Sequence, residues 1–481
     1  MPFIKEDIVK FKPSDNSDPF NLYWGEEVKV IGRLNGDTEI EVLERSLKPI
    51  RGTVKGKLAT QDSRPLHFMM VDVQQGDGMV MITPQGKKIL IDGGDNKLFA
   101  RFVANRFRGS SKQNPVDIDA MIVTHGDADH FAGLNKIVES ERNSTARKRL
   151  FMYPHRVYHN GMVKGPGKRN GKKVPSEKMF GATVKTRSGL AVVDLIDDIL
   201  SVPDTKMNRP FKSWKKSLKH WTQYGQIDFK RIAKGNKREF SFLRKEGIEV
   251  EVLGPVERIV SYKGKKRKAL DFFRKPPKDA NISVDGFDPA GLPYDAGHTI
   301  NGQSIVLRIT YGNVRFFLGG DLNQEGMDKL NSLYRKSDVQ SEILKVPHHG
   351  STDFDLKLLK KISPVISLIS SGDESSRKEY IHPRATLLGA LGRISRNAVS
   401  LIFSTELTAF FAYRGLAKKV DGTGDSFHSF ERTNFGIIHI RTDGERILVF
   451  THSGKKGMKE AYRLTVDKNH QVKLAKKIKR R

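Results

Sequence analysis

The stretch THGDADHFAG, residues 124–133, decides the fold. It places two histidines and two aspartates within six positions, directly after the apolar run MIV and just before a glycine. Apolar residues followed at once by polar side chains are typical of a buried strand that ends in a functional loop. The pattern therefore predicts a strand, a polar loop, and a helix that begins near Asp129 or Phe131.

The four polar side chains of this stretch suit a metal site. Alternate residues of an extended segment point the same way, so His125 and Asp127 are expected to face one space and Asp129 and His130 an adjacent one. Their nitrogen and oxygen atoms are ligands for Zn²⁺ or Mn²⁺. Four ligands in one corner indicate two metals, which lie about 3.5–4 Å apart in hydrolases. The alternative is a helix start with Asp129 as N-cap and the histidines in solvent.

Two more polar clusters follow apolar runs. FFLGGD ends at Asp321, whose carboxylate would bridge two metals, and KVPHHGS brings His348 and His349 off another short strand. A turn aspartate and a structural histidine pair are the alternatives.

Charge dominates the composition of the 481 residues. Lysine and arginine number 85 against 55 acidic residues, a net charge of +30, which favours polyanion partners over a merely lysine-rich surface. No apolar run approaches the roughly 20 residues of a membrane helix, and the N-terminus lacks the apolar centre of a signal peptide. Cysteine is absent, which excludes disulfides and thiolate ligands. A cytoplasmic protein without a membrane partner is expected.

The chain divides into three predicted parts. Residues 1–60 alternate apolar and polar residues between turns and resemble an SH3-like β unit, with Trp24 and Gly52 near its usual landmarks, that would dock a protein partner or act as a spacer. Residues 61–430 form the main domain, with a basic insertion at about 160–290. Residues 431–481 are expected to hold a hairpin around Asp443-Gly444 and a basic tail.

Four motifs in this order, HGDADH, IDGG (Ile91 to Gly94), LGGD and PHHGS, resemble the metallo-β-lactamase superfamily. With VDVQQGDG, which departs from the commoner form at Gln74, they are similar to the hydrolase domain of ComEC-type DNA-uptake proteins over roughly residues 66–410. The resemblance implies an α+β fold, an αββα sandwich of two mixed sheets with helices outside and the metals at one edge.

The resemblance also implies a role for each motif residue. His125 and Asp127 would hold the first metal, Asp129 and His130 the second, Asp321 would bridge, and His349 would complete the second site. Asp92 would support the metal loop, and His348 would lie behind the ligands or touch substrate.

Two further histidines match less closely. His298 in GHTING fits the superfamily's third histidine, but ComEC-like domains stress the asparagine and serine, here Asn301 and Ser304. His382, before Pro383, matches an element that would protonate a leaving group or hold a phosphate, and a helix-start histidine is the alternative.

Metal chemistry of this kind cleaves lactams, thioesters and phosphodiesters, and the charge favours a polynucleotide. We therefore expect a metal-dependent nuclease on DNA that uses two divalent ions and a metal-activated water oriented by Asp129. The alternatives are a phosphodiesterase on small nucleotides or phospholipid-type substrates, and a nucleic-acid-binding protein with a structural metal.

The segment FKSWKKSLKHW has two tryptophans that share one face of a predicted helix, surrounded by lysines. They would stack on the bases of a nucleic acid, or instead pack the helix onto the protein and leave the lysines in solvent. These residues are Lys212, Trp214, Lys215, Lys216, Lys219 and Trp221.

Overall fold

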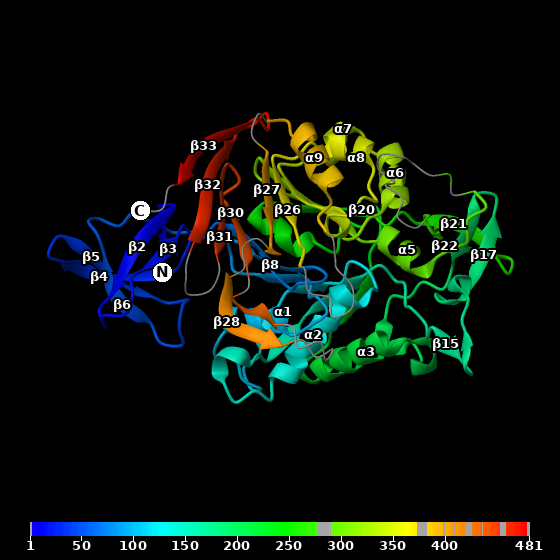
Figure 1. Cartoon of the computed structure of the whole chain (residues 1–481), viewed down its shortest axis with the longest axis horizontal. Coiled ribbons are helices and arrows are strands. Elements are labelled where there is room, and N and C mark those ends of the chain that lie inside the picture. Colours follow the sequence, from blue (N-terminus) through cyan, green and yellow to red (C-terminus); the bar gives the residue numbers. More distant parts are fainter. Residues whose placement is uncertain are drawn as a thin grey trace.

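The computed structural model describes residues 2–277, 288, 290–372, 382–397, 400–406, 410–418, 426–434, 436–452 and 458–478. It is a mixed α/β arrangement in which two large β-sheets face each other and helices cover both outer faces (Figure 1). The layered sandwich expected from the sequence is what the structure has.

The first sheet has ten strands in the order β19-β14-β12-β10-β9-β8-β30-β31-β32-β33. Its central strands are almost wholly apolar, as in LHFMMV and GMVMI, because helices and the second sheet cover both of its faces. The strands are β8 (Leu66–Val71), β9 (Gly78–Ile82), β10 (Lys88–Asp92), β12 (Ala120–Ile122), β14 (Arg156–His159), β19 (Asp228–Arg231), β30 (Ile437–Thr442), β31 (Arg446–His452), β32 (Met458–Val466) and β33 (Val472–Ile478).

The second sheet has six strands in the order β20-β23-β24-β25-β26-β27. Its inner face packs on the inner face of the first sheet, with the Phe68 and Phe316 rings 5.5 Å apart across the interface. The strands are β20 (Ile248–Gly254), β23 (Val306–Tyr311), β24 (Val314–Leu318), β25 (Ile343–Lys345), β26 (Ile366–Ile369) and β27 (Leu401–Ser404).

Helices bury each outer face in a core of its own. The ten-stranded sheet is covered by α1 (Leu98–Arg106), α2 (Ala128–Ser140) and α3 (Arg209–Trp221), and the six-stranded sheet by α6 (Gln324–Leu333), α7 (Lys336–Val339), α8 (Leu356–Ile362) and α9 (Ala385–Ile394). Among the described residues, no helix is long and apolar enough to cross a membrane.

The N-terminal unit is a five-stranded antiparallel sheet in the order β3-β2-β6-β5-β4. It packs beside the ten-stranded sheet: Trp24 is fully buried, and Arg446 of β31 lies 3.5 Å from the centre of its ring. Its assignment as an SH3-like unit and its docking of a protein partner remain predictions. The strands are β2 (Ile8–Pro13), β3 (Phe20–Tyr23), β4 (Val28–Leu34), β5 (Asp37–Val42) and β6 (Ile50–Val54), flanked by β1 (Phe3–Ile4) and β7 (Thr60–Gln61), which pair with each other.

The basic segment 160–290 is only partly an insertion. Its α3 lies in the helix layer, β19 forms the edge of the ten-stranded sheet, and β20 forms the edge of the six-stranded sheet. The remainder builds small sheets at the end of the molecule opposite the N-terminal unit (Figure 1). These are β15 (Lys168–Arg169) with β16 (Lys172–Lys173), and β17 (Thr183–Thr186), β18 (Gly189–Val192), β21 (Arg258–Tyr262) and β22 (Lys265–Asp271).

The C-terminal segment is part of the sandwich and not an appendage. The expected hairpin around Asp443-Gly444 is β30–β31, but β30 pairs with β8 along its whole length. The basic run that begins at Lys473 was expected to be a tail, yet its residues up to Ile478 form β33. Other short pairs are β11 (Val116–Ile118) with β13 (Met152–Pro154), and β28 (Phe410–Lys418) with β29 (Ser426–Asn434).

Candidate metal centre

The polar motifs meet because the strands that carry them end at the same edge of the sandwich. β10 and β12 run parallel in one sheet, and β24, β25 and β26 run parallel in the other. Loops that follow parallel strands gather at one edge. The residues that follow these strands include His125, Asp321 and His349.

The THGDADH loop lies between β12 and α2, which begins at Ala128 with Asp127 at its N-cap position. Its shape depends on a close approach by the VDVQQGDG loop. A Cβ on Gly76 would lie 1.5 Å from the carbonyl oxygen of Asp129, and Gly76 has a φ of +89°. Only glycine fits there. Because the N-cap position of α2 is Asp127, and Asp129 lies in the first turn of the helix, the alternative with Asp129 as N-cap is wrong.

His130 occupies the centre of the cluster and is fully buried. Its Nδ1 lies 2.9 Å from Oδ2 of Asp92, and its Nε2 lies 3.1 Å from Oδ2 of Asp321. Asp92 also accepts hydrogen bonds from the backbone amide (2.8 Å) and the hydroxyl (2.6 Å) of Thr124. The Asp92 carboxylate thus fixes both the ring of His130 and the start of the loop.

His349 approaches the same carboxylate from the other sheet. Its Nε2 lies 3.0 Å from Oδ2 of Asp321 and 3.9 Å from Oδ2 of Asp129. Its Nδ1 lies 3.0 Å from the carbonyl oxygen of Ser370, which fixes the ring orientation. Two imidazoles therefore converge on one oxygen of Asp321.

His125 completes this group. Its ring centre is 4.0 Å from that of His130, and its Nδ1 lies 3.3 Å from the hydroxyl of Ser304. The same hydroxyl accepts a hydrogen bond from the backbone amide of Asp321 at 3.0 Å. Ser304 thus ties His125 to Asp321.

The donor set fits divalent metal ions. Among the described residues, ligand atoms within 4.8 Å of one another occur in four overlapping triads. Two consist of residues that the motifs nominate as ligands, namely His125, His130 and Asp321, and Asp129, His130 and His349; the other two include Asp77. The Nε2 atom of His125 is buried and makes no hydrogen bond within the described residues, whereas those of His130 and His349 are buried against Oδ2 of Asp321. A buried imidazole nitrogen without a partner is costly in a protein interior, and a metal ion would satisfy that of His125.

The cluster also contains two buried residues, Lys345 and Asp77, that the sequence motifs did not nominate. Lys345, at the end of β25, is fully buried; its Nζ pairs with Asp77, lies 3.5 Å from Oδ1 of Asp321, and donates to the carbonyl of Gly320 at 2.7 Å. Asp77, in the VDVQQGDG loop, also lies 3.6 Å from Nδ1 of His349. In the sequence, Lys345 follows Ile343 and Leu344 and precedes Val346, a pattern that predicts a lysine exposed to solvent at the end of a strand. The sequence therefore does not indicate that Lys345 is buried.

The charges of the cluster are strongly coupled. Burial opposes protonation of His130, yet Asp321 and Asp92 outweigh it and raise its pKa well above the usual value. Burial alone would raise the pKa of Asp321, but His130, His349 and Lys345 lower it well below its usual range. Burial also lowers the pKa of Lys345, and Asp77 and Asp321 reverse that effect. Asp321 is thus held as a carboxylate among cations.

Asp127 and His298 lie apart from these triads. Oδ1 of Asp127 accepts a 2.7 Å hydrogen bond from Nζ of Lys164, at the start of the basic segment. His298, in α5 (Ala296–Gly302), pairs with Glu325 at 2.6 Å and lies 3.6 Å from Asp353. The structure therefore places Asp127 at the rim of the cluster and gives His298 other partners.

His348 and His382 flank the centre. Their ring centres are 6.2 Å apart, and Nε2 of His348 lies 3.4 Å from the side-chain nitrogen of Asn301. Burial, and after it the neighbouring His348, lowers the pKa of His382 to about 4. His348 and His349 have φ values of 48° and 52° in the short helix Pro347–Gly350, a left-handed conformation of the kind that clusters at functional sites.

The predicted base-stacking role of Trp214 and Trp221 does not fit the structure. Their side chains are 1% and 0% exposed, and the two rings pack on each other at 5.9 Å beside Phe131. The alternative of a helix docked by its tryptophans is what α3 shows. Three lysines of that helix, Lys212, Lys216 and Lys219, are exposed, whereas Lys215 bonds to Asp204 and to the carbonyl of Val202.

Comparisons with known proteins agree with this geometry. The family model of the metallo-beta-lactamase superfamily matches residues 77–203, which include the THGDADH loop. ComE operon protein 3 of Bacillus subtilis (strain 168) is 30% identical over 115 residues, which are 24% of this chain and 13% of that protein. The aligned region is thus a small part of that relative. The chain carries a domain of the metallo-β-lactamase superfamily and resembles ComEC-type proteins.

Proposed function

We propose that the protein is a metal-dependent hydrolase of phosphodiester bonds that acts on DNA as a nuclease. One observation carries the proposal: Lys164, at the start of the basic segment, pairs with Asp127 of the metal loop. The exposed hairpin β15–β16 begins four residues after Lys164, so Lys168 lies within roughly 14 Å of it along the chain. Lys164 thus lies beside the metal loop, and the exposed cations of the hairpin follow it closely in the chain.

The proposed metal ligands are His125, Asp129, His130, Asp321 and His349, with Asp127 at the rim. Two divalent ions, Zn²⁺ or Mn²⁺, would supply a nucleophile at neutral pH and would neutralise charge that develops on the phosphate. Asp321 lies between His130 and His349 and is suited to bridge the two positions.

The remaining residues of the site would act directly on water and substrate. The Asp129 carboxylate is one-quarter exposed, so it is placed to orient an attacking water. His348 and His382 lie together beside the ligands and would hold a phosphate oxygen or hand a proton to the leaving group. Asp92 and Lys345 would keep the ligands in place.

The charge distribution supports a polymeric substrate. Exposed cations occur on the β15–β16 and β21–β22 hairpins, at the end of the molecule opposite the N-terminal unit, and along α3 (Figure 1). They are Lys168, Arg169, Lys172, Lys173, Lys263, Lys265, Lys266, Arg267, Lys212, Lys216 and Lys219. Contacts to phosphates supply most of the affinity of proteins for nucleic acids.

The direct test is a cleavage assay with linear, circular and single-stranded DNA in Mn²⁺, Mg²⁺, Zn²⁺ or EDTA. Cleavage should need a metal and vanish in the double variant Asp129→Ala/His130→Ala. Cleavage of a small diester that is insensitive to salt, with DNA left intact, would instead favour a small-molecule phosphodiesterase. Salt-sensitive DNA binding without turnover in any metal would favour a binding protein with a structural metal.

The salt dependence of DNA binding should identify the basic hairpin. The logarithm of the affinity falls with the logarithm of salt concentration by about 0.9 for each phosphate neutralised. Replacing Lys172 and Lys173 with glutamine should lower that slope by about 2. The same change at Lys10 and Lys55, exposed lysines of the N-terminal unit, should leave it unaltered. Equal effects of both pairs would remove the hairpin from the DNA path.

Variants of two residues of α3, the buried Trp214 and the exposed Lys212, distinguish a role in the stability of the fold from a role in DNA binding. Trp214→Phe should lower the free energy of unfolding by about 1–2 kcal/mol, because it shrinks a buried side chain, and should leave DNA affinity unchanged. Lys212→Gln should weaken DNA binding and leave stability unchanged, since Lys212 is exposed. Urea unfolding and DNA titration of both variants test this, and a loss of affinity in stable Trp214→Phe would restore the stacking role.

A further inference from the structure

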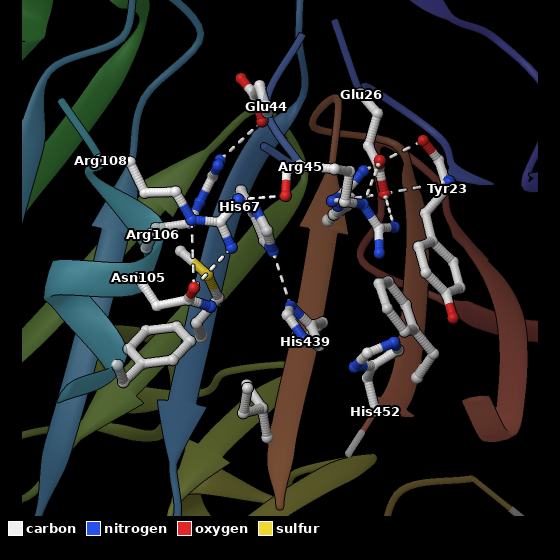
Figure 2. A pocket seen from close by; sticks show the side chains of 15 residues that line it. Tyr23, Glu26, Glu44, Arg45, His67, Asn105, Arg106, Arg108, His439 and His452 are labelled. Atoms are coloured by element: carbon white, nitrogen blue, oxygen red, sulfur yellow. Dashed lines mark hydrogen bonds and ion pairs between the residues drawn. The ribbon is translucent and has the colours of Figure 1, made fainter. Parts of the chain in front are cut away.

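A cavity of about 140 Å³ lies between the N-terminal unit and the main domain, away from the metal ligands (Figure 2). Its walls come from the N-terminal unit, from the end of α1 and from strands β8, β30 and β31 of the ten-stranded sheet. The volume is small beside the roughly 300–1,000 Å³ of sites for drug-sized molecules, so only a small molecule would fit.

The charged groups in the walls do not balance. Glu26 is paired with Arg45, at 2.6 Å and 2.9 Å, and Glu44 with Arg106 at 2.8 Å. Two other arginines also line the cavity, Arg108 and Arg441. Four guanidinium groups therefore face two carboxylates, and both carboxylates already have a partner.

Arg108 and Arg441 are held by neutral oxygen atoms. Arg108 donates to the side-chain oxygen of Asn105 and to the carbonyl of Arg45 (Figure 2), and no carboxylate among the described residues pairs with it. Arg441 is 5% exposed and donates to the carbonyls of Tyr23 and Trp24. Its closest carboxylate oxygen, on Glu26, is 3.8 Å away, and its buried Nε makes no hydrogen bond within the described residues.

Both arginines have pKa values below the usual value for arginine. Burial, together with Arg106 and Arg45, lowers the pKa of Arg108. Burial lowers the pKa of Arg441 to about 10. A buried cation without a full counter-charge, such as Arg441, is costly, and an anion in the cavity that both arginines line would lower that cost.

A row of stacked, uncharged rings also lines the cavity. The rings of Tyr23, Phe450, His439 and His67 form a row, with successive centres 4.2, 4.6 and 5.2 Å apart. His452 stands edge-on to Tyr23 and His439. Burial lowers the pKa of the three histidines, to about 4 for His452, so they are neutral at pH 7. Neutral imidazoles both donate and accept hydrogen bonds, which suits the body of a polar organic molecule.

We propose that this cavity binds a small organic oxyanion, a phosphate or carboxylate, through Arg108 and Arg441, with its uncharged part beside the three histidines that line it. A planar guanidinium recognises either group through paired hydrogen bonds. The site is separate from the metal ligands and does not depend on the nuclease proposal.

Calorimetric titration of the full chain tests the proposal with phenyl phosphate, inorganic phosphate, citrate and benzoate as probes, and phenol as the uncharged comparison. At least one anion should bind one to one with a Kd below about 1 mM and raise the Tm, and phenol should not. Preference for phenyl phosphate or for a carboxylate identifies the oxyanion.

Arg108→Gln should raise the Kd by roughly 10- to 100-fold, the usual worth of a charge-assisted hydrogen bond. Arg108 is half-buried in the turn after α1, and the matched control Arg33→Gln removes an exposed arginine of the N-terminal unit without changing the Kd. His130→Ala, in the metal cluster, should also leave it unchanged. The proposal is overturned if no anion binds, if Arg108→Gln binds as well as the natural chain, or if His130→Ala abolishes binding.

Discussion

Replacing His130 with alanine is expected to lower metal-dependent turnover by at least about 100-fold. Loss of a group that only supports a metal ligand typically costs 10- to 100-fold in metal affinity or activity, and loss of a ligand should cost more. His130 belongs to three of the four triads of ligand atoms found among the described residues, and its two nitrogens face Asp92 and Asp321. No other side chain of the cluster touches both carboxylates at these distances.

Steady-state DNA cleavage in Mn²⁺ measures this effect, with His155→Ala as the control. His155 is a partly exposed histidine that pairs with Asp117 outside the cluster, so its removal should not change the rate. A His130→Ala protein that stays folded and keeps more than about one-tenth of the activity would contradict the ligand assignment.

Replacing Lys345 with methionine is expected to lower the free energy of unfolding of the metal-free protein by about 3–5 kcal/mol. Methionine keeps most of the volume but removes the cation that pairs with Asp77 and lies 3.5 Å from Asp321. Both carboxylates are almost fully buried, and removing one partner of a buried ion pair leaves an uncompensated charge.

Urea unfolding in EDTA measures this change. Lys136→Met is the control, because Lys136 pairs with Glu139 on the surface of α2 and exposed pairs contribute less than about 1 kcal/mol. A loss below about 1 kcal/mol in Lys345→Met would show that Lys345 does not balance the carboxylates. Full recovery of stability on adding Mn²⁺ would show that the ions replace its charge.

The local order of the metal loop could be predicted from the sequence because it depends on near neighbours. An apolar strand, a polar loop and an amphipathic helix are all visible in residues 121–140, and the structure has β12, the loop and α2 there. The motifs also nominated His125, Asp129, His130, Asp321 and His349, which the structure brings together. Their meeting point depends on strand order, which a single sequence does not display.

Other features could not be predicted because long-range packing decides them. Lys345 reads as a solvated lysine until Asp77, from a loop more than 250 residues earlier, is placed beside it. Lys164 forms an ion pair with the carboxylate of Asp127, and nothing near Lys164 in the sequence indicates that contact. Lysines interrupt the apolar face of α3, and β20 alternates apolar residues with glutamates, yet the structure buries both apolar faces in the cores of the sandwich. The SH3-like assignment and the cytoplasmic location remain predictions.

Titration of metal-free protein with Mn²⁺, with bound ions and plasmid cleavage measured in the same samples, tests the central claim most directly. Two ions per chain should bind, cleavage should appear as the second one binds, and Asp321→Asn should lose both the second ion and the activity. Cleavage that persists in EDTA, or two bound ions without any cleavage of DNA, would contradict the assignment of this cluster as the centre of a metal-dependent nuclease.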